Sequence, residues 1–548
     1  MPRDLKTDQE MLRNVLALAE KREFARAAEI ASEALGSGFE HPLLLNVMAT
    51  WLEHQGRLTD SLRLLQRAVQ IAPDDIAVQN ALSLCLQRLD RPAEALQIVD
   101  RLLTAHPELG FAHANRGNAL IALGRLGEAR QSHLRALELE PGNLAAQGAL
   151  ASIATHRGEH EEARGWARKV LARLPGYPDA VLSLAAAELA SGATDSAQLL
   201  LVQLLGDQRA GPAEKARANG LLGDVLDATG QYSEAFRAYA ACNEALQQVY
   251  RRYAEGSGIL PYTESIIAAM QRVEPAHWRA GTGAAPAAAA DRPNGHVFLI
   301  GFPRSGTTLL EVALDGHPRV ASLEEHELLE PGVMAYMREP VDFDLMLKAS
   351  DGELQALRAE YWRQARAAGA GLEGKVFIDK HPLNTLKLPL IARLFPEAKI
   401  LFAQRDPRDV VQSCFRRRFS MNPAMYQLLT LQGAASFYDA TLRLAELGRQ
   451  QLGLRWQSVR YESVVDEMEQ QLRGICSFLD LEWHPALTEF EARSQARERA
   501  TPSTAQLARG LNRAGIGHWR NYESALAAVL PTLAPWAQQL GYAATERA

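Results

Sequence analysis

The chain has 548 residues, of which 47% are hydrophobic and 23% are charged, so it can form several folded domains and is neither a disordered nor a collagen-like protein. Its 59 basic and 65 acidic residues give a net charge of −6, which excludes a general surface for nucleic acid. The four cysteines never show C-x-x-C spacing, which argues against zinc clusters and disulfide scaffolds. Because 18 consecutive apolar residues occur nowhere and charges interrupt the N-terminal segment, we expect a cytoplasmic protein without a membrane span.

The first part of the chain repeats with a period of 34 residues. In the unit 110–143, one helical pattern ends at Gly124 and a second ends at a proline. A single helix pair cannot bury its apolar face alone, so we expect the pairs to stack into an all-α superhelix with a concave groove. The prolines that show the period are Pro73, Pro107, Pro141 and Pro175.

This repeat resembles the tetratricopeptide repeat, whose period is also 34. About seven units cover residues 9–247, and the resemblance implies that their groove binds a peptide or protein, either an acceptor or a separate partner. A spacer or dimerisation element is the alternative, and the sequence gives no oligomeric state. The sequence pattern of residues 248–295 predicts a helical connector followed by an Ala/Pro/Gly linker. Residues 296–548 predict a second domain, which we expect to bind its ligand by itself.

A glycine-rich loop opens the second domain after a short buried strand. Gly301 and Gly306 bracket four residues and are followed by Thr307 and Thr308. This is the spacing of the phosphate loop G-x-x-x-x-G-K-[ST], with threonine where the lysine belongs. Inward N–H groups and a helix N-terminus still suit an anion. Because the lysine is missing and Arg304 is present, the loop favours a nucleotide other than a triphosphate with magnesium.

The loop GFPRSGTTLL is similar to the 5′-phosphosulfate loop of sulfotransferases. That family has a second signature, a strand ending in Arg with a Ser eight residues later, and Arg405 and Ser413 match it. The resemblance implies an α/β P-loop-type domain with a mainly parallel sheet, 3′-phosphoadenosine 5′-phosphosulfate as co-substrate, and no metal. It assigns the 3′-phosphate to Arg405 and Ser413, which an arginine fork and a hydroxyl suit. The resemblance also implies that the nucleotide is bound by residues of the loop, namely Arg304, Ser305, Gly306, Thr307 and Thr308.

Three later residues extend the resemblance toward the C-terminus. Tyr461 stands in the segment VRYESVVDEM, where the family has a tyrosine near the nucleotide. Arg417, twelve residues after Arg405, coincides with a nucleotide-binding arginine. Arg513, in ARGLNRAGIGHWRNYE, is the best candidate for a basic residue of the closing loop that meets the 3′-phosphate end.

Within the sulfotransferases, residues 304–331 and 379–388 are similar to tyrosylprotein sulfotransferases. The resemblance implies an enzyme that moves a sulfuryl group in line to an acceptor hydroxyl, with tyrosine of a peptide or protein favoured. Glu325 takes the place of the catalytic base, and Lys380 with Arg304 would stabilise charge on the leaving phosphate. A base is also needed on chemical grounds, because a phenol has a pKa of about 10.

Alternatives remain open for the base, the acceptor and the class of protein. Glu325 and its acidic neighbours also fit a solvated helical face, and His326 is then the rival base, ahead of His381 and His317. The acceptor alternatives are a carbohydrate, a lipid or a small phenol. A different class is a repeat scaffold with a nucleotide-binding relic domain, against which the joint presence of Arg304, Lys380, Arg405 and Ser413 argues.

Overall fold

The computed structural model describes residues 5–254, 258–279, 293–490 and 513–542. The chain divides into two compact units, Met1–Ser191 and Gly192–Ala548. In the described residues, no helix combines the length and the apolar character needed to cross a membrane.

Paired helices build the first unit, as the 34-residue period predicts. One small residue per repeat also recurs with this period and is fully buried, which lets the paired helices pack closely. In the first unit these residues are Ala27, Ser61, Ala95, Ala129 and Ala163. Asp90 takes the place of the turn glycine after α5 and adopts the same left-handed conformation, with φ of +60°. The helices are α1 (Leu5–Glu20), α2 (Phe24–Gly36), α3 (Pro42–His54), α4 (Leu58–Ile71), α5 (Ile76–Arg88), α6 (Pro92–Ala105), α7 (Gly110–Ala122), α8 (Leu126–Leu139), α9 (Leu144–Arg157), α10 (His160–Arg173) and α11 (Pro178–Ala190).

The second unit begins with the last three helices of this pattern, α12 (Thr194–Gly206), α13 (Pro212–Ala228) and α14 (Tyr232–Val249). Two more helices follow, α15 (Ile259–Gln271) and α16 (Pro275–Arg279). Tyr239 of α14 and Met270 of α15 belong to the same hydrophobic core as Phe298 of the sheet. Helices that the sequence assigned to the repeats and to a connector therefore share a core with the α/β part.

The sheet of the second unit has five parallel strands in the order β2-β3-β1-β4-β5. This confirms the predicted α/β fold with a parallel sheet. The central strands β1 and β4 are buried on both faces, which explains why their sequences, GHVFLI and KILFAQ, are mainly apolar. The strands are β1 (Gly295–Ile300), β2 (Val320–Glu324), β3 (Val376–Lys380), β4 (Lys399–Gln404) and β5 (Arg455–Arg460).

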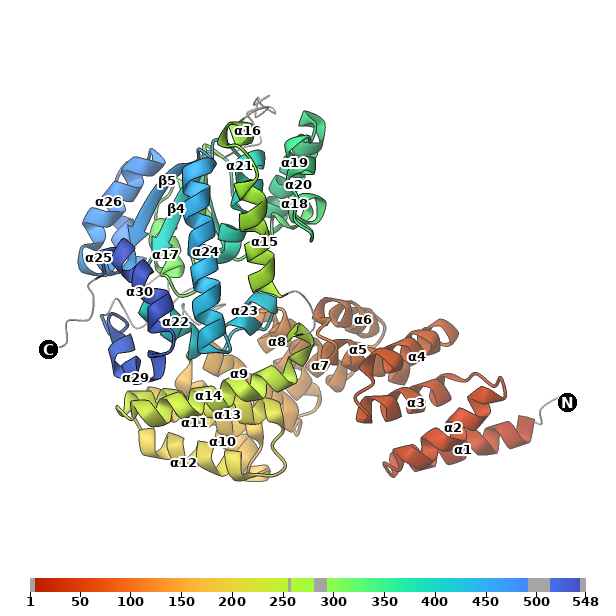
Figure 1. The fold of residues 1–548 in the computed structure, drawn as a ribbon. Helices are drawn as coiled ribbons and strands as arrows, with labels where there is room; N and C mark the ends of the chain where they lie inside the picture. The colour runs from red at the N-terminus through yellow and green to blue at the C-terminus, as the bar shows by residue number, and fades with distance from the viewer. Residues whose placement is uncertain (1–4, 255–257, 280–292, 491–512, 543–548) are drawn as a thin grey trace. The chain divides into compact units, whose positions relative to one another are not determined.

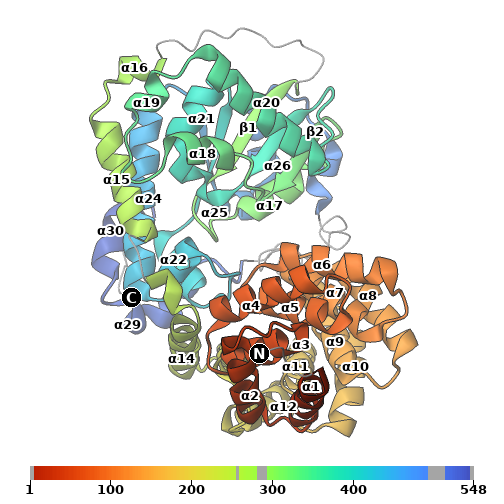
Figure 2. The ribbon, with the colours of Figure 1, turned by 90° about the vertical axis from the view of Figure 1, so that its right-hand side faces the viewer.

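Helices cover both faces of the sheet. Phe298 and Ile300 of β1 face a core with α15, α20, α21, α22 and α24, whereas Val297 and Leu299 face a core with α17, α25 and α26. Figure 1 shows α15 and α24 side by side along the sheet, and Figure 2 shows α20 and α21 beside β1. The helices are α17 (Thr307–Leu314), α18 (Glu330–Tyr336), α19 (Asp344–Leu347), α20 (Asp351–Ala367), α21 (Leu388–Leu394), α22 (Pro407–Phe415), α23 (Pro423–Gln427), α24 (Leu431–Gln451), α25 (Tyr461–Asp466), α26 (Met468–Leu479), α29 (Glu523–Leu526) and α30 (Leu530–Gln539), with 3-10 turns η1 (Arg251–Ala254), η3 (Pro382–Lys387), η4 (Pro485–Thr488) and η5 (His518–Tyr522).

The parallel arrangement gathers the carboxyl ends of the strands at one edge of the sheet. Gly301 follows β1, Glu325 follows β2, Lys380 ends β3, Arg405 follows β4 and Tyr461 follows β5. Ligands of open α/β sheets bind at this edge. The fold thus places residues from separate sequence motifs near one another.

Candidate functional site

Close contacts shape the loop after β1. A Cβ atom on Gly301 would lie 2.8 Å from the carbonyl oxygen of Ala403, so strand β4 leaves no room for a side chain there. Gly306 has φ of +98°, and a Cβ atom on it would lie 2.6 Å from the ring of Tyr461. Glycine is therefore required at both positions. The same contact places Tyr461 directly against the loop.

Arg304 stands in the middle of this loop in a left-handed conformation with φ of +71°. A non-glycine residue held this way is strained, and such strain is concentrated at functional sites. Its Nε donates a hydrogen bond to Ser413 Oγ at 3.0 Å, and its carbonyl oxygen accepts one from Arg405 at 3.1 Å. Residues from the first and second sequence signatures are thus in direct contact.

Arg304, Arg405 and Arg417 form a cluster of positive charge, which we call the arginine cluster. Burial, together with the charges of Arg417 and Arg405, lowers the pKa of Arg304 to about 9. The Nε atoms of Arg405 and Arg417 are buried, and neither has a hydrogen-bond partner in the part of the chain that the structure describes. Buried N–H donors of a guanidinium group that lack a hydrogen-bond acceptor are costly. An anion with several oxygen atoms would satisfy them.

The remaining predicted ligands of the nucleotide lie around this cluster. Ser305, Thr307 and Thr308 are buried around the N-terminus of α17, and the backbone N–H groups of a helix N-terminus favour an anion. The guanidinium carbon of Arg405 lies 4.7 Å from the centroid of the Tyr461 ring. This cation–π contact orients Arg405 toward the loop.

Arg513 is the predicted ligand that the structure does not bring to the cluster. Its side chain is 71% exposed and makes an ion pair of 2.6 Å with Asp466. The carbonyl oxygen of Gly515, two residues later, instead accepts a hydrogen bond from Arg405. The backbone of the predicted closing segment therefore reaches the cluster, although the arginine side chain does not.

Lys380 and Glu325 form the second half of the site. Lys380 is fully buried, and its Nζ lies 2.9 Å from Glu325, 3.1 Å from Glu324 and 3.5 Å from Glu311. Burial alone would lower the pKa of Lys380, but the charges of Glu311, Glu325 and Glu324 outweigh it and raise this pKa. Lys380 is therefore held protonated.

Glu325 is held rigidly although its carboxylate is open to the cavity. Its backbone has φ of +53°, and its N–H donates to the carbonyl oxygen of Lys380 at 2.7 Å. Its side chain is 40% exposed. One carboxylate oxygen contacts Lys380, so the carboxylate combines a fixed position with access to a substrate.

The histidines that rival Glu325 are placed less favourably. His326 is exposed, its Nδ1 contacts the carbonyl oxygen of Glu324, and it does not line the cavity beside Glu325. His381 lines that cavity, but its Nε2 lies 3.1 Å from a carboxylate oxygen of Glu327. Both ring nitrogens of His317 contact backbone atoms, at 3.0 and 3.1 Å.

A cavity of about 370 Å³ adjoins the loop and Glu325. Arg304, Thr307 and Thr308 line its inner end, and apolar side chains cover much of the rest. Such a mixture of an apolar wall and a few polar groups is typical of a substrate pocket. The apolar and aromatic side chains are Ile259, Tyr262, Pro303, Val333, Pro382, Leu383, Leu386, Phe419, Pro423, Ala424 and Met425.

The sequence analysis missed this apolar wall. Ile259 and Tyr262 belong to α15, within the residues interpreted as a connector, and Tyr262 donates a hydrogen bond to the carbonyl oxygen of Met337. No motif marks these residues. The apolar spacing in ILPYTESIIAAM was the available signal, because a solvent-exposed connector would not need it.

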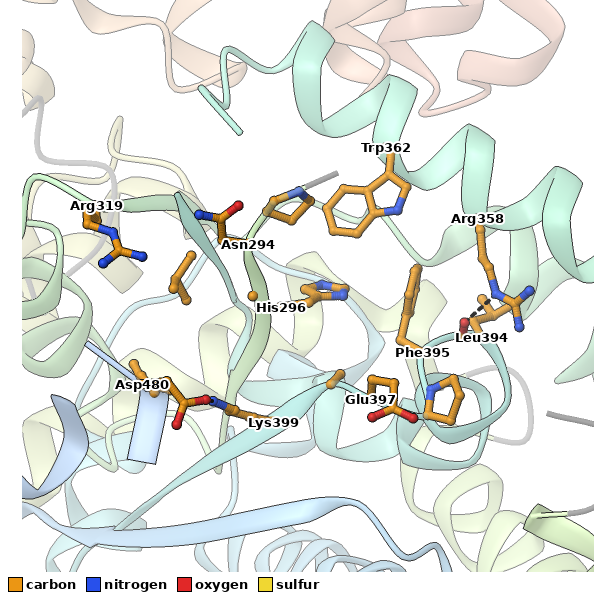
Figure 3. A pocket seen from close by; sticks show the side chains of 16 residues that line it. Asn294, His296, Arg319, Arg358, Trp362, Leu394, Phe395, Glu397, Lys399 and Asp480 are labelled. Carbon is orange, nitrogen blue, oxygen red and sulfur yellow. Dashed lines mark hydrogen bonds and ion pairs between the residues drawn. The ribbon is translucent and has the colours of Figure 1, made fainter. Parts of the chain in front are cut away.

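A second cavity, of about 440 Å³, lies at the amino ends of β1, β3 and β4 (Figure 3). His296 and Phe395 face it, while Lys399 is paired with Asp480 at its border. None of the predicted site residues lines it. We therefore place the candidate site at the carboxyl edge, where loops and helix N-termini meet.

In the described ranges, no group of three or more His, Cys, Asp and Glu side chains is arranged to hold a metal ion.

Comparisons with known proteins identify the class of each part. Residues 296–485 match a family model described as "Sulfotransferase family". Residues 12–76, 52–114 and 114–178 match models described as "Tetratricopeptide repeat". The chain therefore carries tetratricopeptide repeats followed by a domain of the sulfotransferase family, which confirms the two resemblances in the sequence.

Individual relatives are distant. An uncharacterized protein of Aquifex aeolicus (strain VF5) is 25% identical over 73% of this chain, which spans 51% of that relative's length. Protein-tyrosine sulfotransferase 2 of Gallus gallus is 26% identical over 45% of this chain and 69% of its own. Protein-tyrosine sulfotransferase 1 of Danio rerio is 25% identical over 45% of this chain and 72% of its own. Among solved structures, a tetratricopeptide repeat protein from Parabacteroides merdae is 19% identical, with a TM-score of 0.36, over 43% of this chain and 92% of its own.

Proposed function

We propose that this protein transfers a sulfuryl group from 3′-phosphoadenosine 5′-phosphosulfate to an acceptor hydroxyl, that of a tyrosine in a peptide or protein. The arginine cluster is the observation that carries the proposal, because Arg405 and Arg417 each have a buried Nε atom that an anion could accept from. The similarity to protein-tyrosine sulfotransferases supports the tyrosine acceptor.

The donor supplies the sulfuryl group, and the chain supplies its binding site. The proposal assigns the 3′-phosphate to Arg405 and Ser413, with Arg417 and Tyr461 beside the nucleotide. Arg513 can bind the nucleotide only after its ion pair with Asp466 breaks. The 5′-phosphate side is assigned to the loop residues Arg304, Ser305, Gly306, Thr307 and Thr308. Since their donors are backbone N–H groups, hydroxyls and a guanidinium, the site needs no metal to neutralise the phosphates.

The reaction needs a base at the acceptor hydroxyl and a positive charge at the leaving phosphate. Glu325 takes the proton of the acceptor hydroxyl, since its carboxylate is anchored by Lys380 yet faces the cavity. Lys380 and Arg304 stabilise the negative charge that develops on the leaving phosphate, as fixed charges in a desolvated site do. Lys380 can act in this way because its glutamate neighbours keep it protonated.

The other parts of the proposal concern partners and place of action. The repeats support a peptide or protein partner bound in their groove, because stacked helix pairs of this kind form extended binding surfaces. We propose the cytoplasm as the compartment, since the four cysteines are all free and buried in the described chain.

The donor assignment is tested by calorimetry without magnesium. We expect 3′-phosphoadenosine 5′-phosphate to bind at least tenfold more tightly than 5′-AMP, because only the former engages Arg405 through a 3′-phosphate. Arg405→Ala should remove this difference. Equal affinity of the wild type for both nucleotides would contradict the assignment.

The acceptor assignment is tested with labelled donor and a tyrosine-containing peptide library, followed by mass spectrometry. Incorporation of a sulfuryl group on tyrosine supports it. Labelling of carbohydrate, lipid or small phenols, with none on peptides, would leave the donor assignment intact and replace the acceptor.

A further inference from the structure

Helices α13 and α14, both in the second unit, hold the end of α22. Asn243 of α14 donates a hydrogen bond from Nδ2 to the carbonyl oxygen of Phe415 at 2.9 Å, and both partners are buried. The ring of Phe236 stacks on the ring of Phe415 with 5.2 Å between their centroids. These contacts fix the backbone just before the three consecutive arginines 416–418.

Two aspartates of α13 bind the outer arginines of this triplet. Arg416 donates to Asp227 at 2.7 Å, and Arg418 donates to Asp224 at 2.9 Å. A Cβ atom on Gly220 would lie 2.4 Å from a terminal nitrogen of Arg418, so α13 makes room for this side chain. Since Asp224 and Asp227 stand three residues apart, they lie on the same face of α13.

The middle arginine, Arg417, belongs to the arginine cluster. Its charge contributes to the lowered pKa of Arg304, and its own Nε is buried without a partner in the described residues. Arg416 and Arg418, each hydrogen-bonded to an aspartate, thus anchor the chain on both sides of Arg417. The anchoring keeps Arg417 near two other positive groups, a position that repulsion would otherwise disfavour.

Asp227 also contacts the segment 515–522, which reaches the arginine cluster through the backbone of Gly515. Its Oδ1 accepts a hydrogen bond from Tyr522 at 2.5 Å and lies 3.2 Å from Nε2 of His518. The same segment contains Gly515, whose carbonyl oxygen accepts from Arg405. One carboxylate of a repeat helix therefore links two segments that meet the proposed nucleotide site.

We propose that Asp224 and Asp227, in the last helix pair of the repeat pattern, are positioning residues for the nucleotide site. They hold Arg417 and the segment around Gly515 in the geometry that selects a 3′-phosphate. This inference rests on the proposed function, and it makes the final repeat part of the sulfotransferase machinery rather than only a surface for partners.

The physical reason lies in the cost of unpaired buried charge. Three arginines lower the pKa of Asp224 against the effect of its burial, which shows how strongly they interact. Removing Asp224 takes away the carboxylate that pairs with Arg418, and removing Asp227 leaves Arg416 only the more distant Asp224, at 3.8 Å. A partly buried guanidinium whose pairing is weakened in this way tends to turn toward water. The backbone around Arg417 is then free to move away from Arg304.

The test measures nucleotide selectivity in the full-length chain. For Asp227→Asn and Asp224→Asn, we expect affinity for 3′-phosphoadenosine 5′-phosphate to fall at least tenfold, whereas affinity for 5′-AMP stays within about twofold. Asp227→Glu should recover part of the loss, because it restores the carboxylate. Asp100→Asn is the matched control, since it removes another aspartate–arginine pair of the repeats, with Arg116, and should change neither affinity.

A milder variant covers the case in which the aspartate variants do not fold. Tyr522→Phe removes only a hydroxyl from Asp227 and should lower the preference for the 3′-phosphate by about two- to fivefold. The inference is overturned if every folded variant keeps the wild-type preference while Arg405→Ala loses it. If the wild type itself shows no such preference, the proposed function fails and the inference fails with it.

Discussion

Glu325 and Lys380 illustrate how much chemistry depends on single residues at strand ends. The ammonium group of Lys380 lies within 3.5 Å of a carboxylate oxygen of each of three glutamates. Two of these glutamates, Glu311 and Glu324, are 1% and 19% exposed, whereas Glu325 is 40% exposed. The same ion cluster therefore contains two structural carboxylates and one that a substrate can reach. This difference in exposure is what favours Glu325 as the base.

Replacing the base should separate turnover from binding. Glu325→Gln preserves size but cannot accept the proton, so turnover should fall by roughly 10²-fold or more. Affinity for the donor nucleotide, measured by calorimetry, should stay nearly unchanged. His326→Ala is the matched control at the neighbouring position and should retain activity. Loss of transfer in His326→Ala, with Glu325→Gln still active, would contradict the carboxylate mechanism.

Asp379, which precedes Lys380 in β3, should make the stability of the folded chain depend on pH. Burial raises the pKa of Asp379 to about 6, although it accepts a hydrogen bond from Tyr361. Since the folded chain binds this proton more tightly than the unfolded chain, Asp379 contributes stability below about pH 4 that is lost as pH rises to 6. Relative to the wild type, Asp379→Asn should gain about 2 kcal/mol of unfolding free energy between pH 4 and pH 8.

Urea unfolding at a series of pH values measures this effect. The comparison uses the change with pH and not the absolute difference, because asparagine also alters the hydrogen bonds to Tyr361 and Asn384. A difference between the two proteins that stays constant from pH 4 to pH 8 would show that Asp379 has an ordinary pKa.

At the scale of elements, the turn from β1 into α17 is the part of the site most sensitive to shape. It must pass strand β4 at Gly301 and the Tyr461 ring at Gly306. The sequence predicted this element well, because glycine spacing encodes a local backbone geometry. It also predicted the strands that precede the loop and Arg405, since the second signature is itself a strand that ends in arginine.

Adding one methyl group to this turn should reduce nucleotide binding. In Gly306→Ala, the Cβ atom meets Tyr461 at 2.6 Å while φ is +98°, so the ring and Arg405 behind it must shift. We expect affinity for 3′-phosphoadenosine 5′-phosphate to fall at least tenfold in calorimetry. Gly374→Ala is the matched control, because it has φ of +68° but no atom within 4 Å of the added Cβ. It should cost about 1 kcal/mol of stability and leave binding unchanged. A similar binding loss in both variants would assign the effect to backbone strain alone.

At the scale of the whole molecule, sequence reasoning worked where the signal was local or periodic. The 34-residue period predicted the helix pairs, and the two sulfotransferase signatures predicted the parallel α/β fold. It did not predict that Asp227 pairs with Arg416, because an aspartate on a repeat helix looks like any surface charge until its partner is placed in space. For the same reason it assigned Ile259 and Tyr262 to a connector, although they line the cavity.

The hydrophobic core of the second unit crosses the boundary that the sequence predicted at residue 296. Leu226, Tyr239, Ile266 and Trp278 are all buried in one core with Phe298 of the sheet. A fragment that begins at residue 296 would expose the apolar surface that these side chains cover. It would also lose the aspartates that hold Arg416 and Arg418. The structure therefore changes our initial expectation that residues 296–548 bind nucleotide by themselves.

Two fragments of the chain test this boundary. We expect residues 192–548 to unfold in one cooperative transition and to bind 3′-phosphoadenosine 5′-phosphate within about threefold of the full-length affinity, since they contain the complete compact unit. Residues 296–548 should aggregate or bind at least tenfold more weakly, because exposed core surface and unpaired arginines destabilise the site. Thermal unfolding and calorimetry measure both properties. If residues 296–548 are monomeric, melt cooperatively and bind like the full chain, the helices before the sheet are not needed to form the nucleotide site.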